Sequence, residues 1–282
     1  MTCKVMGATP SADTVRSMDG FGGLLKRWRT TRRLSQEQLA FDAEISTRHL
    51  SYLETGKSKP SREMVLLLAS ALELELRERN TMLSSAGFAA MYTSSGLESM
   101  EMAPVRRAID LILAKQEPYG AIVVDRVWNV LRINEGAGRL LMRFLPEAAE
   151  EPQRATNIVK SSLDPKGLRP YIVNWVEVAT FALERLEREC MMFPTDVARL
   201  ALRDEVRAYP GVEVLLPFET QSAGAPVSLV HLKRGDDEAR LFTMITTIGT
   251  PLDVTAQELA IETYFPADNA TERWTQSLTP PP

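Results

Sequence analysis

The stretch RRLSQEQLAFDAEISTRHLSYLETGKSKPS, residues 32–61, constrains the fold of this 282-residue chain more than any other. Ser35 followed by Gln38 has the spacing of a capping box, in which each side chain satisfies a backbone amide at a helix start. The apolar rhythm then breaks, and Ser46 can begin a second short helix that ends near Gly56, where a left-handed residue is favoured. The sequence therefore predicts two short helices joined by a tight turn.

Flanking segments place this helix pair in a small helical domain. An apolar stripe at helical spacing predicts a helix that ends near Arg32 and is built on Phe21, Leu24, Leu25 and Trp28. Ser61 can cap a fourth helix, and a fifth is expected over residues 75–86. We expect an all-α N-terminal domain of about five helices over residues 18–90.

The net charge of −4 conceals an asymmetry between the two parts of the chain. Residues 1–92 hold 13 Lys and Arg against 10 Asp and Glu, so the acidic excess lies in the remainder. Residues 24–33, LLKRWRTTRR, contain five basic side chains and no acidic one. Clustered cations of this kind favour contact with a phosphate backbone.

The second helix of the pair carries polar and basic side chains on its free face, which is typical of a helix that reads DNA. Arg48 can donate two hydrogen bonds to guanine, while Thr47 and Ser51 can contact base edges or thymine methyl groups. Gln36 and Lys57, near a helix start and a helix end, can hold phosphates. The alternative is a helical protein-interaction domain with the same core pattern.

The segments LSQEQLA, ISTRHLSYLE and GKSKPS, within residues 34–61, resemble the XRE-type helix-turn-helix regulators in order and spacing. The resemblance covers about residues 20–88 and implies double-stranded DNA as a partner. It also places Tyr52 at a base-contacting position, although a tyrosine there could pack sideways. Glu44 stands where the family's turn usually has glycine, and a left-handed residue there costs about 1–2 kcal/mol. We expect a homodimer whose two readers address half-sites about one helical turn apart.

Residues 91–103 are mostly short and polar, and they predict a linker before a second domain over residues 104–270. Helical spacing there covers residues 105–117, 135–144, 168–190 and 196–208. Strand-like runs cover residues 119–125, 128–134, 227–234, 240–248 and 257–265.

The order of these segments predicts an α+β chain. Its second domain is expected to be a five-stranded antiparallel sheet covered on one face by helices. The first two strands should form a hairpin with a two-residue connection at Arg126 and Val127. Alternation in the last strand predicts Glu258, Glu262 and Tyr264 on a solvent-exposed face.

The order of these elements resembles a PAS-type sensory domain. The residues that carry the resemblance are Asn134, NIVK, DPKGLRP, NWVEVA, the pair Tyr209 and Pro210, and TIGTPLDVTAQELAIETYFPAD, within residues 134–268. Together with the N-terminal helices they resemble the MmyB-like regulators, whose PAS-like C-terminal domain binds fatty acids. The resemblance implies a pocket between sheet and helices for a long-chain acid such as myristate. Each buried methylene contributes about 0.8 kcal/mol, so an apolar tunnel can hold an alkyl chain with few polar contacts.

Candidate residues for this pocket follow from their place in the predicted elements. The lining candidates, which could equally be ordinary core, are Trp175, Val178, Phe181, Phe242 and Met244. The candidates for a donor to the carboxylate head are Arg132, Asn134, Asn174 and His231.

The sequence lacks the motifs that are typical of several other classes of protein. There is no nucleophile elbow, phosphate-binding glycine loop, HExxH or paired-cysteine motif, so we expect no enzyme and no catalytic residue. The two cysteines, Cys3 and Cys190, and the two histidines lie too far apart for a metal site. The open alternatives are a haem or flavin PAS sensor and a constitutive regulator whose C-terminal domain only dimerises.

No apolar run approaches 18 residues, and the N-terminus lacks the apolar core of a signal peptide. We therefore expect no membrane span and a cytoplasmic location.

Overall fold

The computed structural model describes residues 20–213, 215, 227 and 229–278. Residue contacts divide the chain into two units that meet in the sequence between Tyr92 and Thr93. The first two residues of the expected N-terminal domain, 18 and 19, lie outside the described residues, as does Cys3.

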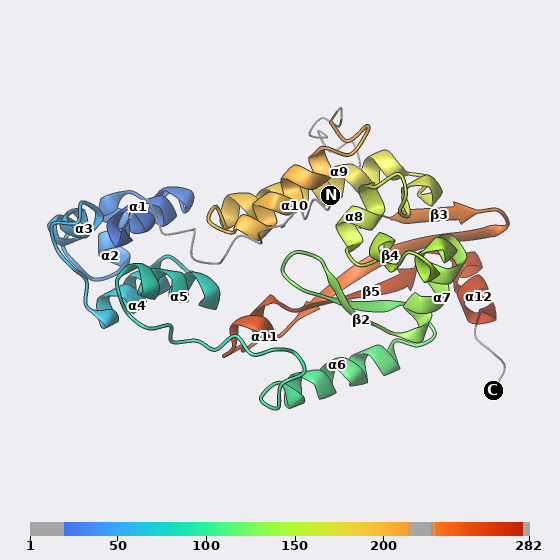
Figure 1. The fold of residues 1–282 in the computed structure, drawn as a ribbon, viewed down its shortest axis with the longest axis horizontal. Helices are drawn as coiled ribbons and strands as arrows, with labels where there is room; N and C mark the ends of the chain where they lie inside the picture. Colours follow the sequence, from blue (N-terminus) through green and yellow to red (C-terminus); the bar gives the residue numbers. More distant parts are fainter. Residues whose placement is uncertain (1–19, 214, 216–226, 228, 279–282) are drawn as a thin grey trace, which may run out of the picture. The chain divides into compact units, whose positions relative to one another are not determined.

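The described residues of the first unit, 20–92, form helices and the turns between them (Figure 1). Its helices are α1 (Phe21–Thr31), α2 (Gln36–Asp42), α3 (Thr47–Glu54), α4 (Arg62–Ala71) and α5 (Leu76–Ser85). The predicted helical domain is therefore confirmed. Its core contains Leu25, Trp28, Leu39, Leu50 and Leu68, all fully buried.

Serine caps set the starts of three of these helices, as predicted. The backbone amides of Gln38, His49 and Met64 donate to the side chains of Ser35, Ser46 and Ser61. The reciprocal half of the capping box is wrong, however. The Gln38 side chain donates to Asp42 Oδ1 at 2.8 Å instead of turning back to the helix start.

The turn between α2 and α3 has a residue in the left-handed conformation, which costs free energy when that residue is not glycine. Glu44 has a φ of 51°, in the region that glycine favours. Gly56, with a φ of 70°, takes the same conformation after α3, which confirms the predicted helix end.

The second unit is an antiparallel sheet packed with helices (Figure 1). Its helices are α6 (Ala103–Lys115), α7 (Glu135–Phe144), α8 (Ile158–Leu163), α9 (Trp175–Met192), α10 (Val197–Arg207), α11 (Val254–Glu258) and α12 (Asn269–Ser277). Short 3-10 turns cover Pro146–Ala149, Pro152–Arg154 and Arg169–Tyr171. Among the described residues, no helix is long and apolar enough to cross a membrane.

The sheet has five strands in the order β2-β1-β5-β4-β3, each antiparallel to its neighbours. They are β1 (Ala121–Val124), β2 (Val130–Ile133), β3 (Val230–Arg234), β4 (Asp237–Thr247) and β5 (Ala260–Pro266). The chain therefore has the predicted α+β fold with a five-stranded antiparallel sheet.

Helices cover both faces of this sheet, so the expectation of one covered face was wrong. Ala121 and Val123 pack with the apolar side of α6, while the alternate residues Ile122 and Val124 pack with α8, α9 and α10. Figure 1 shows α6 below the sheet and α8 and α9 above it. Because β1 is buried on both faces, its four residues are all apolar.

The hairpin between β1 and β2 also differs from the prediction. Five residues, 125–129, connect the strands instead of two. The Asp125 carboxylate accepts hydrogen bonds from the backbone amides of Val127 and Asn129, both at 2.9 Å, and Trp128 adopts a φ of 66°. This turn buries the Trp128 side chain against α9, where sequence alternation had placed it on a strand.

The last strand begins later than predicted. Residues 254–258 form α11, capped by Asp253, and β5 starts at Ala260. Glu262 and Tyr264 do not face solvent, because they lie on the side of the sheet that α8 and α9 cover.

Candidate DNA interface and ligand cavity

Helix α3 presents the predicted reader residues on its free side. Leu50 and Leu53 are buried beneath it, whereas Thr47 and Arg48 are exposed and Ser51 is half-buried. Helical spacing accounts for Arg48 and Ser51, which are three residues apart and share one face, and for Leu50 and Leu53, which share another.

Arg48, Tyr52 and Lys57 form a small cluster at this surface. Arg48 Nε donates to the Tyr52 hydroxyl at 3.1 Å. The cations of Arg48 and Lys57 lie 5.4 and 5.7 Å from the centroid of the Tyr52 ring. Tyr52 is 36% exposed, so it lies beside Arg48 at the surface.

A buried ion pair fixes α3 against α1 and α2. Glu54 accepts from Arg29 Nε at 2.6 Å and from Arg29 Nη2 at 3.1 Å. Gln36 Nε2 donates to the same carboxylate at 2.7 Å, which leaves its second N–H for a phosphate. Burial on its own would raise the pKa of Glu54, but the hydrogen bonds from Arg29 and Gln36 outweigh it and lower the pKa.

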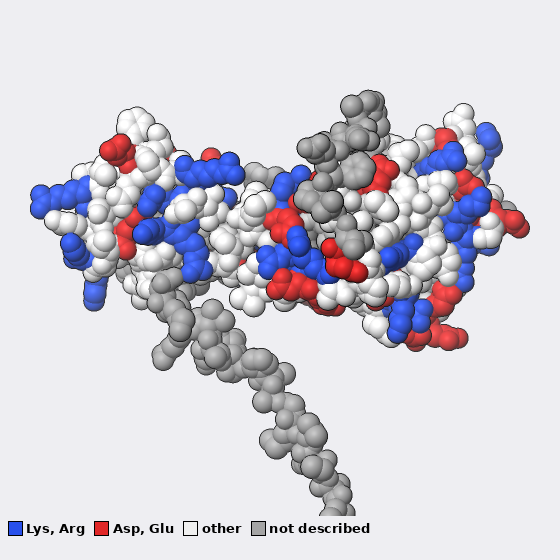
Figure 2. All heavy atoms as spheres, turned by 90° about the horizontal axis from the view of Figure 1, so that it is seen from above, with Lys and Arg blue, Asp and Glu red and all other residues white. Residues whose placement is uncertain are grey.

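Basic side chains are spread over the visible face of the helical unit, with fewer acidic ones among them (Figure 2). The second unit shows basic and acidic groups mixed on the same face. The charge asymmetry of the sequence is therefore also present on this face of the molecule.

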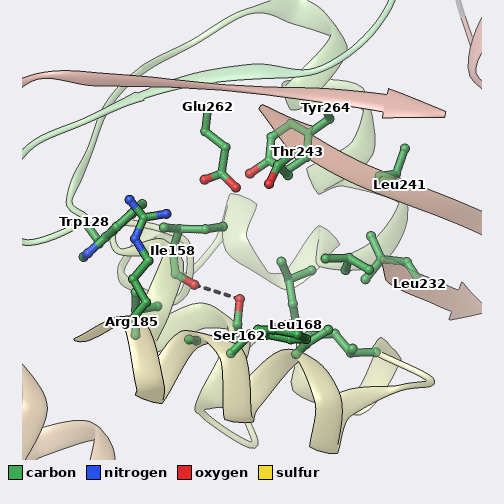
Figure 3. Close-up of a pocket in the computed structure, with 16 residues that line it drawn as sticks. Trp128, Ile158, Ser162, Leu168, Arg185, Leu232, Leu241, Thr243, Glu262 and Tyr264 are labelled. Carbon is green, nitrogen blue, oxygen red and sulfur yellow. Dashed lines mark hydrogen bonds between the residues drawn. The ribbon is translucent and has the colours of Figure 1, made fainter. Parts of the chain in front are cut away.

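In the second unit a cavity of about 250 Å³ lies between the sheet and helices α8 and α9 (Figure 3). Most of its wall is apolar. The lining residues are Trp128, Ile158, Val159, Ser162, Leu168, Ile172, Val178, Phe181, Ala182, Arg185, Val230, Leu232, Leu241, Thr243, Glu262 and Tyr264.

A second apolar cavity of about 90 Å³ adjoins the first. The two share Ile158, Leu168, Leu232 and Tyr264 as wall residues.

Arg185 and Glu262 lie toward one end of the cavity, away from Leu232 and Leu241 (Figure 3). On the helix side, Arg185 stacks over Trp128 at 4.0 Å from the ring centroid. Glu189 holds both residues, since its carboxylate accepts from Arg185 Nε at 3.1 Å and from Trp128 Nε1 at 3.2 Å.

On the sheet side, the carboxyl of Glu262 lies beside the side-chain oxygens of Thr243 and Tyr264 (Figure 3). Burial raises the pKa of Glu262, and the hydrogen bond from Thr243 and the charge of Arg185 offset this only in part. Burial also raises the pKa of Tyr264, with a further contribution from the charge of Glu262.

Some of the predicted lining residues are in this wall and some are not. Val178 and Phe181 line the cavity, and Trp175 lies next to it, with its indole donating to the Ser162 carbonyl at 3.1 Å. Phe242 and Met244 belong to the other face of β4. Phe242 stacks on Phe265 with centroids 5.5 Å apart, and Met244 is 57% exposed.

None of the four candidate head-group donors lines the cavity. Arg132 donates to Asp110 at 2.7 Å and to Glu98 at 2.6 Å, on the side of the sheet where α6 lies. His231 Nε2 lies 2.8 Å from Glu238 Oε1, and its neighbours Val230 and Leu232 point into the cavity in its place.

The two asparagines are structural. Asn174 donates to the Leu229 carbonyl at 2.8 Å and accepts from the His231 amide at 3.0 Å. Asn134 is 8% exposed and caps α7, with its oxygen and nitrogen both bonded to backbone groups. Neither side chain is therefore available to a ligand.

Sequence reasoning missed several polar residues that do border the cavity, among them Arg185, Thr243 and Glu262. A charged residue inside an alternating strand is usually read as exposed. The signal was the position of Glu262 between Ile261, which packs in the cluster that contains α6, and Thr263, which is also buried, because alternation then turns Glu262 to the opposite face. In the described part of the chain, no group of three or more His, Cys, Asp or Glu could hold a metal ion.

Comparison with known proteins agrees with this division. Residues 21–82 match the family model for a helix-turn-helix domain, and residues 105–278 match that for the MmyB-like transcription regulator ligand binding domain. The protein is thus a DNA-binding helix-turn-helix transcription regulator with a separate ligand-binding domain. Because the second match covers more than half of its length, the chain belongs to the MmyB-like family.

Two solved structures are similar to this chain, one over a short part of it and the other over most of it. The restriction-modification controller protein C.AhdI from Aeromonas hydrophila is 39% identical over 21% of this chain and 89% of its own, with a TM-score of 0.20. An RNA-binding light-oxygen-voltage receptor is 13% identical over 97% of this chain and 68% of its own, with a TM-score of 0.24. A search among curated protein sequences returns no match.

Proposed function

We propose that the protein binds a long-chain fatty acid of the size of myristate in the cavity of its second domain and that occupancy changes its affinity for DNA. The observation that carries this proposal is the pair of adjoining apolar cavities with polar groups at one end. An alkyl chain gains about 0.8 kcal/mol per buried methylene there, and the polar end can receive a head group.

The DNA contacts are proposed from the exposed side of α3. Thr47, Arg48, Ser51 and Tyr52 face the bases, while Gln36 and Lys57 hold phosphates. The exposure of Thr47 and Arg48, and the caps that fix the start of α3, support this assignment. Arg48 reads a guanine through its terminal nitrogens.

The domain limits that accompany this function are residues 18–90 for the DNA-binding domain, 91–103 for the linker and 104–270 for a PAS-like ligand-binding domain. The strand order 2-1-5-4-3 supports the PAS-like assignment. We place the regulator in the cytoplasm as a homodimer that binds two half-sites. The dimer has two states that differ in DNA affinity. The fatty acid changes DNA affinity only to the extent that it binds one of these states more tightly than the other.

Solvent extraction of the purified protein followed by mass spectrometry tests the ligand. A long-chain acid is expected at up to one molecule per chain. Val178→Trp, which fills the cavity, should lose it, whereas Val176→Trp should retain it, because Val176 is 51% exposed on the same helix outside the wall. Empty extracts from wild type, together with no binding of added myristate, would leave a constitutive regulator whose second domain only dimerises.

Selection of bound DNA from a random pool, with and without myristate, tests the coupling. A shift in operator affinity on addition of myristate, absent in Val178→Trp, is expected. Equal affinity in both conditions would show that the lipid does not regulate DNA binding.

A further inference from the structure

We propose that Glu262 meets the head of the bound lipid and that a carboxylic acid enters the cavity together with one proton, which the two carboxyl groups then share. This inference rests on the proposed fatty-acid function and specifies how its polar end is recognised. It concerns a residue that no resemblance assigned and that sequence reasoning placed on a solvent-exposed face.

Glu262 lies on β5, where it pairs with Ile122 of β1, and its side chain points into the cavity. Its carboxyl oxygens lie among the side-chain oxygens of Thr243 and Tyr264 (Figure 3). A ligand that fills the apolar part of the cavity therefore ends beside these three groups.

The charged or titratable residues in the wall are Arg185, Glu262 and Tyr264. Arg185 is the cation, and Glu189 is hydrogen-bonded to it at 3.1 Å and already compensates its charge. The wall therefore offers a ligand carboxylate no uncompensated positive charge.

A bound fatty acid adds a second carboxyl group to this end of the cavity. Two ionised carboxylates at one buried site repel each other, and the low dielectric strengthens that repulsion. One proton taken from solvent removes it and converts the pair into an O–H···O⁻ hydrogen bond, which is short and strong. No bond to carbon forms or breaks, and the total charge of the site stays at that of the empty cavity with Glu262 ionised.

The shifted titration of Glu262 agrees with this arrangement. Burial raises the pKa of its carboxyl even without a ligand, although Thr243 and Arg185 oppose the shift. Tyr264, whose pKa is also raised, stays neutral and can donate its hydroxyl to the shared pair.

Calorimetric titration of the full-length wild-type protein with sodium myristate tests the proposal. Titrations at pH 8.5 in two buffers with different heats of ionisation give the number of protons bound with the ligand. We expect uptake approaching about one proton per myristate, and an affinity that falls about tenfold per pH unit above the pKa of Glu262 in the empty cavity. Myristamide, which carries no charge, should bind with little proton uptake.

Glu262→Gln provides the matched variant, since glutamine can donate a hydrogen bond but does not titrate. It should bind myristate without proton uptake and with an affinity independent of pH between pH 7 and 9. Glu135→Gln serves as the control, because the Glu135 side chain is 88% exposed in the same domain, and it should behave as wild type.

The outcomes separate this inference from the proposed function. Binding of myristate by wild type without proton uptake, at an affinity that does not change with pH, would overturn the role of Glu262 and leave fatty-acid binding intact. Failure to bind myristate or myristamide at any pH would overturn both. The wild-type titrations need no variant, so the test stands even if Glu262→Gln does not fold.

Discussion

Tyr52 accepts a hydrogen bond from Nε of Arg48, one helical turn earlier on α3, with 3.1 Å between the two atoms. The guanidinium carbon also lies 5.4 Å from the centroid of the tyrosine ring. This contact occupies Nε and leaves both terminal nitrogens of Arg48 for the O6 and N7 acceptors of a guanine. Tyr52 therefore orients the residue that we assign to base reading.

Removal of the arginine tests that assignment directly. Arg48→Ala should weaken operator binding by about 1–3 kcal/mol and relax the preference at one base pair, because a bidentate contact to guanine is lost. Binding to a panel of operators with single base substitutions measures both effects. An equal loss on every sequence would assign Arg48 to the phosphate backbone.

Removal of only the tyrosine hydroxyl tests the orienting role. Tyr52→Phe should cost about 0.5–1.5 kcal/mol on the same operator and nothing on an operator that lacks the guanine read by Arg48. In a double-mutant cycle the cost should vanish in the Arg48→Ala background. Additive effects of the two substitutions would mean that Tyr52 contacts DNA independently.

Lys57 differs from Arg48 in the kind of contact that it should make. Lys57→Ala is expected to weaken binding to all DNA sequences alike and to reduce the slope of log affinity against log salt by about 0.9. Affinities measured over a series of salt concentrations give this slope. Lys166, an exposed cation of the second unit, provides the control, and Lys166→Ala should leave the slope unchanged.

The helical unit was predictable from sequence because its determinants are local. A serine three residues before the amide that it caps fixes the starts of α2, α3 and α4, and the 3.6-residue repeat then fixes which side chains lie inside. Arg48 was placed on the free face by that repeat alone. The ion pair of Arg29 with Glu54 was not foreseen, because 25 residues separate the partners.

The cavity was only partly predictable, because its wall depends on which of two alternating sets of strand residues faces it. Alternation divides β4 into two sets of residues but does not say which set faces the cavity. The aromatic and methionine side chains Phe242 and Met244 favoured the wrong set, whereas Leu241 and Thr243 line the wall. Helices on both faces of the sheet removed the contrast between a buried and an exposed side that would have decided the matter.

The buried ion pair makes the stability of the helical unit depend on pH. The pKa of Glu54 is lowered in the folded state, so its stabilising effect is full above the unfolded-state pKa of about 4.3 and is lost as the pH falls through the folded-state value. Glu54→Gln should lower the free energy of unfolding by about 1.5–3 kcal/mol at pH 7. The difference from wild type should shrink below about pH 4.

Urea unfolding followed by far-ultraviolet circular dichroism at pH 7 and pH 3.5 measures this difference. Glu37→Gln, at an exposed position in the first turn of α2, is the control and should cost less than about 1 kcal/mol at pH 7. A deficit for Glu54→Gln that is as large at pH 3.5 as at pH 7 would show that the charge of Glu54 does not stabilise the fold.

Asn134 was predicted as a donor to the ligand carboxylate, but its side chain bonds to backbone groups, so its two possible roles can be tested against each other. Its oxygen accepts from the amides of Ala121 and Ala137 at 2.8 and 2.9 Å, and its nitrogen donates to the carbonyls of Tyr119 and Leu113 at 2.8 and 3.2 Å. These bonds tie β1, the end of α6 and the start of α7 together. Asn134→Ala should therefore lower the free energy of unfolding by about 2–4 kcal/mol, since it removes a helix cap and leaves buried backbone groups unpaired.

Urea unfolding of the second unit, followed in parallel with myristate binding at a urea concentration where the variant is folded, separates the two roles. The expected result is a lower unfolding midpoint with myristate affinity within about threefold of wild type, because a difference of less than about 0.7 kcal/mol indicates that no head-group contact was lost. Unchanged stability combined with a large loss of myristate affinity would instead restore Asn134 as a donor to the carboxylate.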